Sequence, residues 1–429
     1  MKALDNAPFF GYFFETQTAK FMHINSIAAK LQADLADLGV IALLRELIQA
    51  PSYIGLPRQE EQAVAVLAEY FEKHEIEFST TEVRPGRPNL SATVRGPKPG
   101  GHLILCGHTD TVAPNTITTM APFGAEMRAG RIYGRGAVDM KGPVATMAAA
   151  LVALKNFHLL EKGQVTLAAV IDEEMESLGA EALIYSGIAG DGAIVGEPTS
   201  NQIAIGHKGL EWLEIEFLGK ATHGGTREKG VNAISAAARF MRIIEDELTP
   251  QLQARYHPVL GAPTINLGTI RGGDQPSTVA ARCAIQLDRR WVPAETIDQV
   301  FGELEEILAS VRNAIPGLKT ELRRVPGGMA TMAHGPLEIA ADHPLVRACQ
   351  KAREEIYGDA GALTAFPAWT DAALLSREAK IPCLVCGPGD LSLAHSAEES
   401  IAISEVEEAV PLYALAAIHF LAENGRNQT

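Results

Sequence analysis

The 429-residue sequence contains few cysteines and no long apolar run. Its five cysteines are scattered along the chain, which is typical of a reducing compartment and argues against a disulfide framework. No apolar run approaches the roughly 20 residues that a membrane-spanning helix needs. The first 20 residues lack the basic lead and the cleavage site of a secretory signal. We therefore expect a cytoplasmic protein without a membrane span, and buried strand thiols at Cys383 and Cys386.

Basic residues are also in short supply. The sequence has 37 lysines and arginines against 52 aspartates and glutamates, which gives a net charge of −15. Because this excess of negative charge repels phosphate groups, neither nucleic acid nor an anionic membrane is expected as a partner. Carboxylates gathered in a metal site would account for part of the excess.

The length predicts two domains. In residues 1–206 and 316–429 apolar strands alternate with helical segments, which predicts an α/β domain with a mostly parallel mixed sheet and helices on both faces. Between 207 and 315 the order becomes β-α-β-β-α, and residues 212–218 alternate between apolar and polar. That alternation is typical of a half-exposed antiparallel sheet. The second domain, of α+β type, is therefore expected to be inserted into the first.

One short stretch carries the first chemical signal. The apolar run 103–105 predicts a buried strand, and His108 and Asp110 follow it two residues apart. On an extended segment both side chains face the same side at the strand's carboxyl end, where α/β sheets place their chemistry. An aspartate beside a histidine is typical of a metal ligand, because the carboxylate accepts the second ring N–H. A buried histidine satisfied by its neighbour fits this stretch equally well.

Other acids and a second histidine are predicted at the same place. Each follows an expected strand or lies in a glycine-marked loop, and they are Asp139, Glu173, Glu174, Glu197 and His395. Taken singly, each is more often a solvated loop residue. The run Asp172-Glu173-Glu174 is more informative, because three acids directly after an apolar strand repel one another unless a cation lies near. Adjacent glutamates can also divide the labour, one binding metal and the other moving a proton.

Five segments together resemble the co-catalytic zinc peptidases and deacylases. This family includes acetylornithine deacetylase, succinyl-diaminopimelate desuccinylase, aminoacylase and carboxypeptidase G. The segments are Gly-His108-Thr-Asp110-Thr-Val, Gly-Arg-Gly to Asp139-Met-Lys-Gly, Asp172-Glu173-Glu174, Gly-Glu197-Pro-Thr and Ala-His395-Ser. They occur in the family's order and at its usual spacings.

The resemblance implies a site with two zinc ions per subunit, and cobalt or manganese would also suit its nitrogen and oxygen ligands. The implied ligands are His108 and Glu197 for one ion, Glu174 and His395 for the other, and Asp139 as the bridge. Asp110 is then expected to orient His108, and Glu173 to act as general base. Two metals also bridge a water and lower its pKa, so hydroxide is available near pH 7. The Asp139–Met140 peptide bond is expected to be cis.

The inserted domain resembles the family's lid, through which its members form homodimers. By this resemblance His223, in a glycine-flanked loop, stabilises the oxyanion in the partner's active site, and Arg290 binds a substrate carboxylate. Ser277 and Asp371 match further positions near the substrate. The alternatives are a solvent-exposed loop histidine for His223 and a surface arginine at a strand end for Arg290.

The expected function is a metal-dependent hydrolase of amino-acid metabolism. It would cleave the amide bond of a small N-acyl amino acid with a free α-carboxylate, as acetylornithine deacetylase and succinyl-diaminopimelate desuccinylase do. A carboxypeptidase or dipeptidase of the same family is the alternative. A non-catalytic metal-binding scaffold is disfavoured because an acid is present at Glu173. A nucleotide-binding fold is disfavoured because Gly134-Arg135-Gly136 lacks the third glycine and follows no strong strand.

Overall fold

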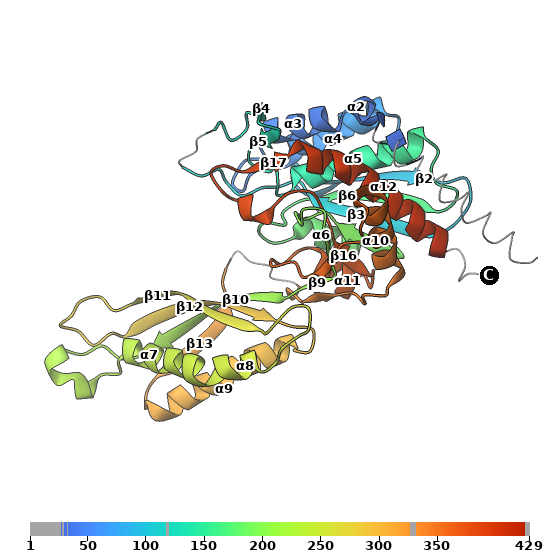
Figure 1. Cartoon of the computed structure of the whole chain (residues 1–429). Helices are drawn as coiled ribbons and strands as arrows, with labels where there is room; N and C mark the ends of the chain where they lie inside the picture. The colour runs from blue at the N-terminus through green and yellow to red at the C-terminus, as the bar shows by residue number, and fades with distance from the viewer. Residues whose placement is uncertain (1–26, 28–29, 32, 117–119, 327–331, 425–429) are drawn as a thin grey trace, which may run out of the picture.

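The computed structural model describes residues 27, 30–31, 33–116, 120–326 and 332–424. They form a large domain built on an eight-stranded sheet and an inserted domain, residues 209–324, built on a four-stranded sheet (Figure 1). The chain crosses between the two domains at β9 (Gly206–His207) and β14 (Leu337–Glu338), which pair with each other. This pairing brings both ends of the insertion to one place.

The large sheet is mixed and mostly parallel at its centre, as predicted. β3 pairs in parallel with β6 and β7, and β16 continues in parallel with β7, whereas β1 and β2 form an antiparallel edge. In spatial order the strands are β1 (Glu77–Arg84), β2 (Arg87–Arg95), β6 (Gln164–Val170), β3 (His102–His108), β7 (Gly192–Val195), β16 (Cys383–Val385), β8 (Ile203–Ala204) and β15 (Leu363–Thr364).

Helices cover both faces of this sheet, because its central strands are apolar on both sides. Leu103 and Leu105 of β3 belong to one core, and Ile104 and Cys106 belong to the other. The first core lies under α2 (Leu35–Leu38), α3 (Val40–Gln49), α4 (Glu61–Lys73), α5 (Lys141–Asn156), α10 (Pro344–Tyr357) and α12 (Ile403–Asn424). The second lies under α6 (Leu178–Tyr185) and α11 (Ala372–Arg377).

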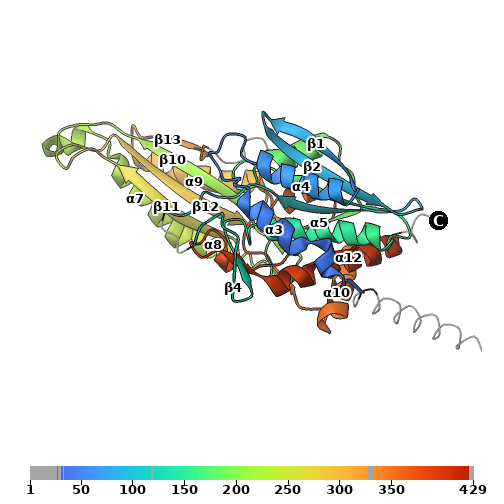
Figure 2. The same cartoon turned by 90° about the horizontal axis from the view of Figure 1, so that it is seen from above.

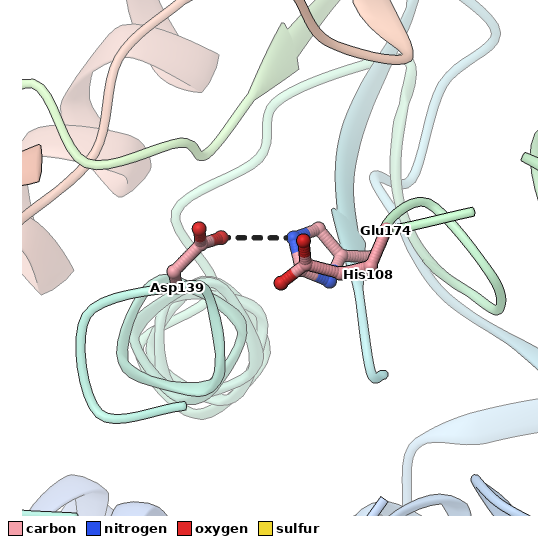
Figure 3. A group of neighbouring side chains, drawn as sticks. All are labelled: His108, Asp139 and Glu174. Carbon is pink, nitrogen blue, oxygen red and sulfur yellow. Dashed lines mark hydrogen bonds and ion pairs between the residues drawn. The ribbon is translucent and has the colours of Figure 1, made fainter. Parts of the chain in front are cut away.

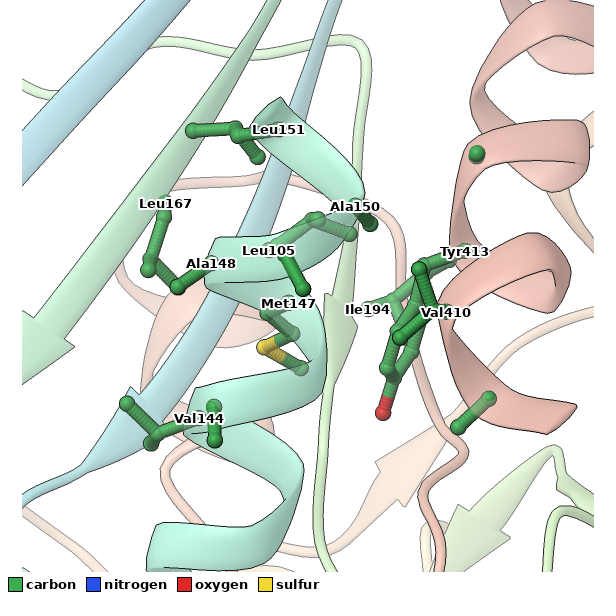
Figure 4. Close-up of a cluster of buried hydrophobic side chains, with 14 of the residues drawn as sticks. Leu105, Val144, Met147, Ala148, Ala150, Leu151, Leu167, Ile194, Val410 and Tyr413 are labelled. Carbon is green, nitrogen blue, oxygen red and sulfur yellow. The ribbon is translucent and has the colours of Figure 1, made fainter. Parts of the chain in front are cut away.

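Helix α5 is buried almost from end to end, from Lys141 to Leu154. Its many alanines let it pack between the sheet and α12. Figure 4 shows Met147 and Ala150 of α5 with Leu105 on the strand side and Tyr413 of α12 on the other. Because α5 begins two residues after Asp139, this packing helps to fix the backbone from which that carboxylate projects.

The inserted domain is an antiparallel sheet with helices on one face, as the sequence predicts. Leu213, Ile215 and Phe217 of β10 are buried in its core, whereas Trp212 is exposed. The strands in spatial order are β11 (Thr264–Gly272), β12 (Arg282–Trp291), β10 (Gly209–Leu218) and β13 (Lys319–Arg324). The helices are η1 (Gly224–Lys229), α7 (Ala233–Ile243), η2 (Ile244–Leu248), α8 (Thr249–Gln253) and α9 (Ile297–Ala314). The expected boundary at residue 315 precedes β13, which pairs with β10 and so belongs to this sheet.

A small three-stranded sheet joins distant parts of the large domain. It consists of β4 (Glu126–Arg128), β5 (Arg131–Tyr133) and β17 (Ser400–Ala402), and η3 (Leu391–Leu393) lies shortly before β17. The five cysteines are buried and free, which confirms the expectation for Cys383 and Cys386. Within the described ranges, no helix has the length and apolar character that crossing a bilayer requires.

Candidate metal centre

The predicted ligands converge at the carboxyl ends of three neighbouring strands. His108 ends β3, Glu173 and Glu174 follow β6, and Glu197 follows β7. The spatial order β6-β3-β7 places these ends side by side, because all three strands run in the same direction. Asp139 reaches the same place from the loop before α5, and His395 from the loop after η3.

Asp139 lies between the two histidines. Its Oδ1 is 3.0 Å from Nε2 of His108, and its Oδ2 is 3.1 Å from Nε2 of His395. Oε1 of Glu174 is also 3.1 Å from Nε2 of His395. Figure 3 shows His108, Asp139 and Glu174 directed toward one another. A carboxylate whose two oxygens face different histidines has the arrangement of a bridge between two metal ions. The Asp139–Met140 peptide bond is cis, as expected.

Two further carboxylates face His108. Oε1 of Glu197 is 3.8 Å and Oε2 of Glu173 is 4.0 Å from its Nε2. His108 therefore takes part in two groups of three ligand atoms, one with Asp139 and Glu174 and one with Glu173 and Glu197. Imidazole nitrogens and carboxylate oxygens are donors that suit zinc, cobalt and manganese, so the residues present fit a two-metal centre.

The electrostatics of the cluster call for added positive charge. Burial raises the pKa of Glu197 well above its usual value, and the neighbouring Asp139 raises it further. Burial opposes ionisation of Asp139 as well, but hydrogen bonds from the two histidines hold its pKa below the usual value. Hydrogen bonds to Asp139 and Glu174 raise the pKa of His395 to about 10. Protons thus serve as the counter-charge that bound cations would replace.

Asp110 does more than the sequence suggested. Nδ1 of His108 lies 3.0 Å from the main-chain oxygen of Asp110 and 3.5 Å from its carboxylate. The carboxylate itself accepts the backbone N–H groups of Glu173 and Glu174, each at 3.1 Å. One buried side chain therefore holds the end of β3 to the turn that carries both glutamates.

A partly buried ion-pair cluster also contacts Asp172, the first residue of this acidic run. Arg87 donates to both carboxylate oxygens of Glu60, and its Nη2 is also 2.6 Å from Oδ1 of Asp172. Asp172 has φ +71°, a left-handed conformation that costs free energy for a residue with a Cβ. Sequence reasoning missed Arg87 and Glu60, because nothing in their local patterns indicates a link to residue 172.

A cavity of about 250 Å³ opens beside the cluster, between the two domains. Glu173, Glu174 and His395 line one wall. Arg290 and Glu211 of the inserted domain line the other. The guanidinium of Arg290 is oriented by Asp288, whose carboxylate accepts from Nε at 2.8 Å and from Nη2 at 3.1 Å. The predicted carboxylate-binding arginine and the predicted general base thus line the same cavity.

Outside the metal cluster, three predicted site residues do not line this cavity. His223 and Ser277 are exposed and lie next to each other, since Gly224 N–H donates to the Ser277 carbonyl at 2.7 Å. His223 follows the carboxyl end of β10, and Ser277 lies between β11 and β12. Asp371 is 2% exposed, and burial raises its pKa to about 7. It does not line the cavity, but its charge interacts with His108, Glu173 and Glu197 of the metal cluster.

Comparisons with known proteins agree with this architecture. A family model described as peptidase family M20/M25/M40 matches residues 104–419. An acetylornithine deacetylase from Proteus mirabilis is 32% identical over 382 residues, which cover 86% of this chain and 93% of the relative.

Two solved structures share the fold. An aminopeptidase from Bacillus cereus has a TM-score of 0.71 at 20% identity, with 89% of this chain and 98% of that one covered. A dinuclear metal-binding peptidase of the M20 family from Bacillus subtilis has a TM-score of 0.66 at 15% identity, with 92% and 99% covered.

The fold, the cluster of carboxylates and histidines, and these matches define a metal-dependent hydrolase of amide bonds. The chain belongs to peptidase family M20/M25/M40.

Proposed function

We propose that this protein removes the acyl group from a small N-acyl amino acid, as a di-zinc deacylase of the acetylornithine deacetylase and succinyl-diaminopimelate desuccinylase type. The observation that carries the proposal is the position of Asp139 between two histidines, one of which, His395, lines a cavity together with Glu173 and Arg290. The identity of the deacylase relative supports the choice of an N-acyl amino acid over a peptide.

The residues assign naturally to two ions. His108 and Glu197 would hold one, Glu174 and His395 the other, and Asp139 would bridge them, which leaves Glu173 beside His108 without a ligand role. Zinc bound there would supply Lewis acidity, lowering the pKa of a water and polarising the amide carbonyl. Cobalt or manganese would satisfy the same donors.

Glu173 is the proposed general base. It borders the cavity, and burial together with the charge of Glu197 raises its pKa well above that of an ordinary carboxyl. A raised pKa suits a group that must accept a proton from the attacking water and then return it to the leaving amine. Arg290 would bind the α-carboxylate of the substrate through its remaining N–H donors.

The proposed active form is a homodimer in which His223 and Ser277 serve the partner's cavity. Leu210 and Glu211, at the start of β10, line the cavity of their own chain. β10 has ten residues, which span about 33 Å. The chain then continues extended, because Gly219 N–H donates to Ala281 O and Val279 N–H to Thr222 O. His223 is thus carried away from its own metal centre.

A cytoplasmic location is part of the proposal and is supported by the five free thiols. The decisive test assays zinc-loaded protein against N-acetyl amino acids, N-succinyl amino acids and dipeptides. We expect the highest kcat/KM on an N-acyl amino acid, loss of activity after exhaustive chelation, and recovery with zinc or cobalt. Preference for dipeptides would instead favour the carboxypeptidase or dipeptidase alternative. Full activity with metal content near zero would refute the proposal.

A further inference from the structure

A buried ion pair links the loop that carries Asp139 to the loop that carries His395. Nη1 of Arg135 donates to Oε2 of Glu399, and both residues are 4% exposed. Oε1 of Glu399 accepts the backbone N–H of Val138 at 3.1 Å and that of Asp139 at 3.3 Å. Glu399 therefore fixes the main chain of the proposed bridging ligand itself.

Arg135 makes the reciprocal contact with the other loop. Its Nη2 donates to the main-chain oxygen of His395 at 3.3 Å and to Oδ1 of Asn115 at 2.7 Å. Beside the pair, the N–H of Gly134 donates to the Glu399 carbonyl at 3.0 Å. Pairing of β5 with β17 continues the connection. Two loops distant in sequence are thus held by one charged pair and a short ladder of backbone hydrogen bonds.

The two histidines differ in how much support they have without this pair. His108 is 1% exposed, ends a central strand, and is bonded through Nδ1 to Asp110. The side chain of His395 is 48% exposed, and the residue has φ +60° in a loop outside any strand. Its position relative to Asp139 depends on contacts made by its backbone, and Arg135 provides one of them.

We propose that Arg135 and Glu399 are positioning residues that set the affinity of the metal position formed by His395, Glu174 and Asp139. The inference rests on the proposed two-metal site. Because a ligand held out of place must be reordered when the ion binds, loss of an outer contact typically weakens metal affinity 10- to 100-fold. The position formed by His108 and Glu197 shares Asp139 but keeps the buried strand end and the Nδ1 contact of His108. The loss should therefore be larger at the position that contains His395.

The experiment titrates metal-free full-length protein with Zn²⁺ in competition with a chromophoric chelator. In wild type we expect two ions per chain. In Glu399→Gln we expect one of the two affinities to fall roughly 10- to 100-fold and the other to fall by a smaller factor. Arg135→Met should behave similarly, and Arg135→Lys should recover part of the loss because it restores the charge.

The inserted domain offers a matched control. Arg289 and Glu295 form an ion pair of similar burial, with side chains 1% and 4% exposed and 2.5 Å between Nη2 and Oε1. Glu295→Gln should leave both zinc affinities unchanged. If Glu399→Gln does not fold, as judged by circular dichroism, the test compares Arg135→Lys with wild type. We then expect a smaller loss of zinc affinity, again mainly at one position.

Three results would overturn the inference: no change in either affinity, equal loss of both, or the same loss in Glu295→Gln. A wild-type chain that binds fewer than two ions would instead contradict the two-metal proposal. The stoichiometry of wild type therefore distinguishes failure of the proposed function from failure of the positioning role.

Discussion

The two domains place their functional side chains in opposite ways. In the large domain, residues far apart in sequence converge within one chain. The two carboxylate oxygens of Asp139 lie 3.0 Å and 3.1 Å from the Nε2 atoms of His108 and His395. In the inserted domain, residues close together along β10 and its extension diverge. Glu211 lines the cavity, whereas His223 lies beyond the remote end of the same strand.

This difference follows from the sheets. Parallel strands joined by helices bring successive carboxyl ends to one edge, so a single chain completes a ligand cluster there. An antiparallel strand carries its residues along a line, and the two ends of that line cannot serve one cavity. The inserted domain therefore lines the cavity of its own chain at one end, and in the proposed homodimer its other end would serve the second chain.

The largest effect is expected from a change in the large domain. Glu173→Gln should lower kcat by roughly 10²- to 10⁴-fold while both zinc ions remain bound, because an amide cannot relay a proton. Glu174→Gln is the matched neighbour, and it should instead reduce zinc content, since Glu174 contacts His395 at 3.1 Å. Kinetics and metal analysis of the two purified variants make the comparison. If Glu173→Gln loses metal and Glu174→Gln does not, the two roles are reversed.

The next largest effect is expected at His223, and a mixing experiment tests whether this residue acts in the partner's site. His223→Ala alone should lose roughly 10²- to 10³-fold in kcat if its imidazole stabilises the oxyanion. Mixed with Glu173→Ala, it should regain activity, because a mixed dimer has one intact site. With equal amounts and random exchange, about half of the dimers are mixed, so about a quarter of wild-type activity should return.

The mixing result has clear opposites. Both single variants can be inactive and the mixture can stay inactive even though subunit exchange has been verified. That result would place His223 in its own chain's site. A fully active His223→Ala variant would show that His223 is an exposed loop histidine without a catalytic role.

The smallest effect concerns the near end of the inserted domain. Arg290→Gln should raise KM at least about tenfold with little change in kcat, because a hydrogen-bonded charge pair contributes about 1.5–3 kcal/mol to binding. Arg282 on the same strand is a suitable control, since its side chain is 68% exposed and paired with Glu216. Arg282→Gln should leave KM unchanged. Equal KM values for the Arg290 variant and wild type would remove Arg290 from the substrate site.

Much of the site was predictable from the sequence because acids and histidines mark the ends of apolar strands. His108, Glu173 and Glu197 each follow such a run, and alternation with helices predicts a parallel sheet that gathers those ends. Arg290, Ser277 and Asp371 were instead predicted from the resemblance to the zinc peptidases and deacylases, and of these three only Arg290 lines the cavity. Such a resemblance carries no information about where a side chain is exposed.

What the sequence by itself determined is the set of candidate ligands, the mixed α/β fold and the existence of an insertion, because hydrophobic period and local motifs are short-range signals. Only the tertiary structure decided how the ligands are held. Arg135 and Glu399 are 264 residues apart, and Asp110 reaches the glutamate turn only because β3 and β6 are neighbours. β13 likewise joins the inserted sheet by pairing with β10, which lies roughly 100 residues earlier in the chain. Such partners are chosen by packing across the whole chain, and a local pattern does not record them.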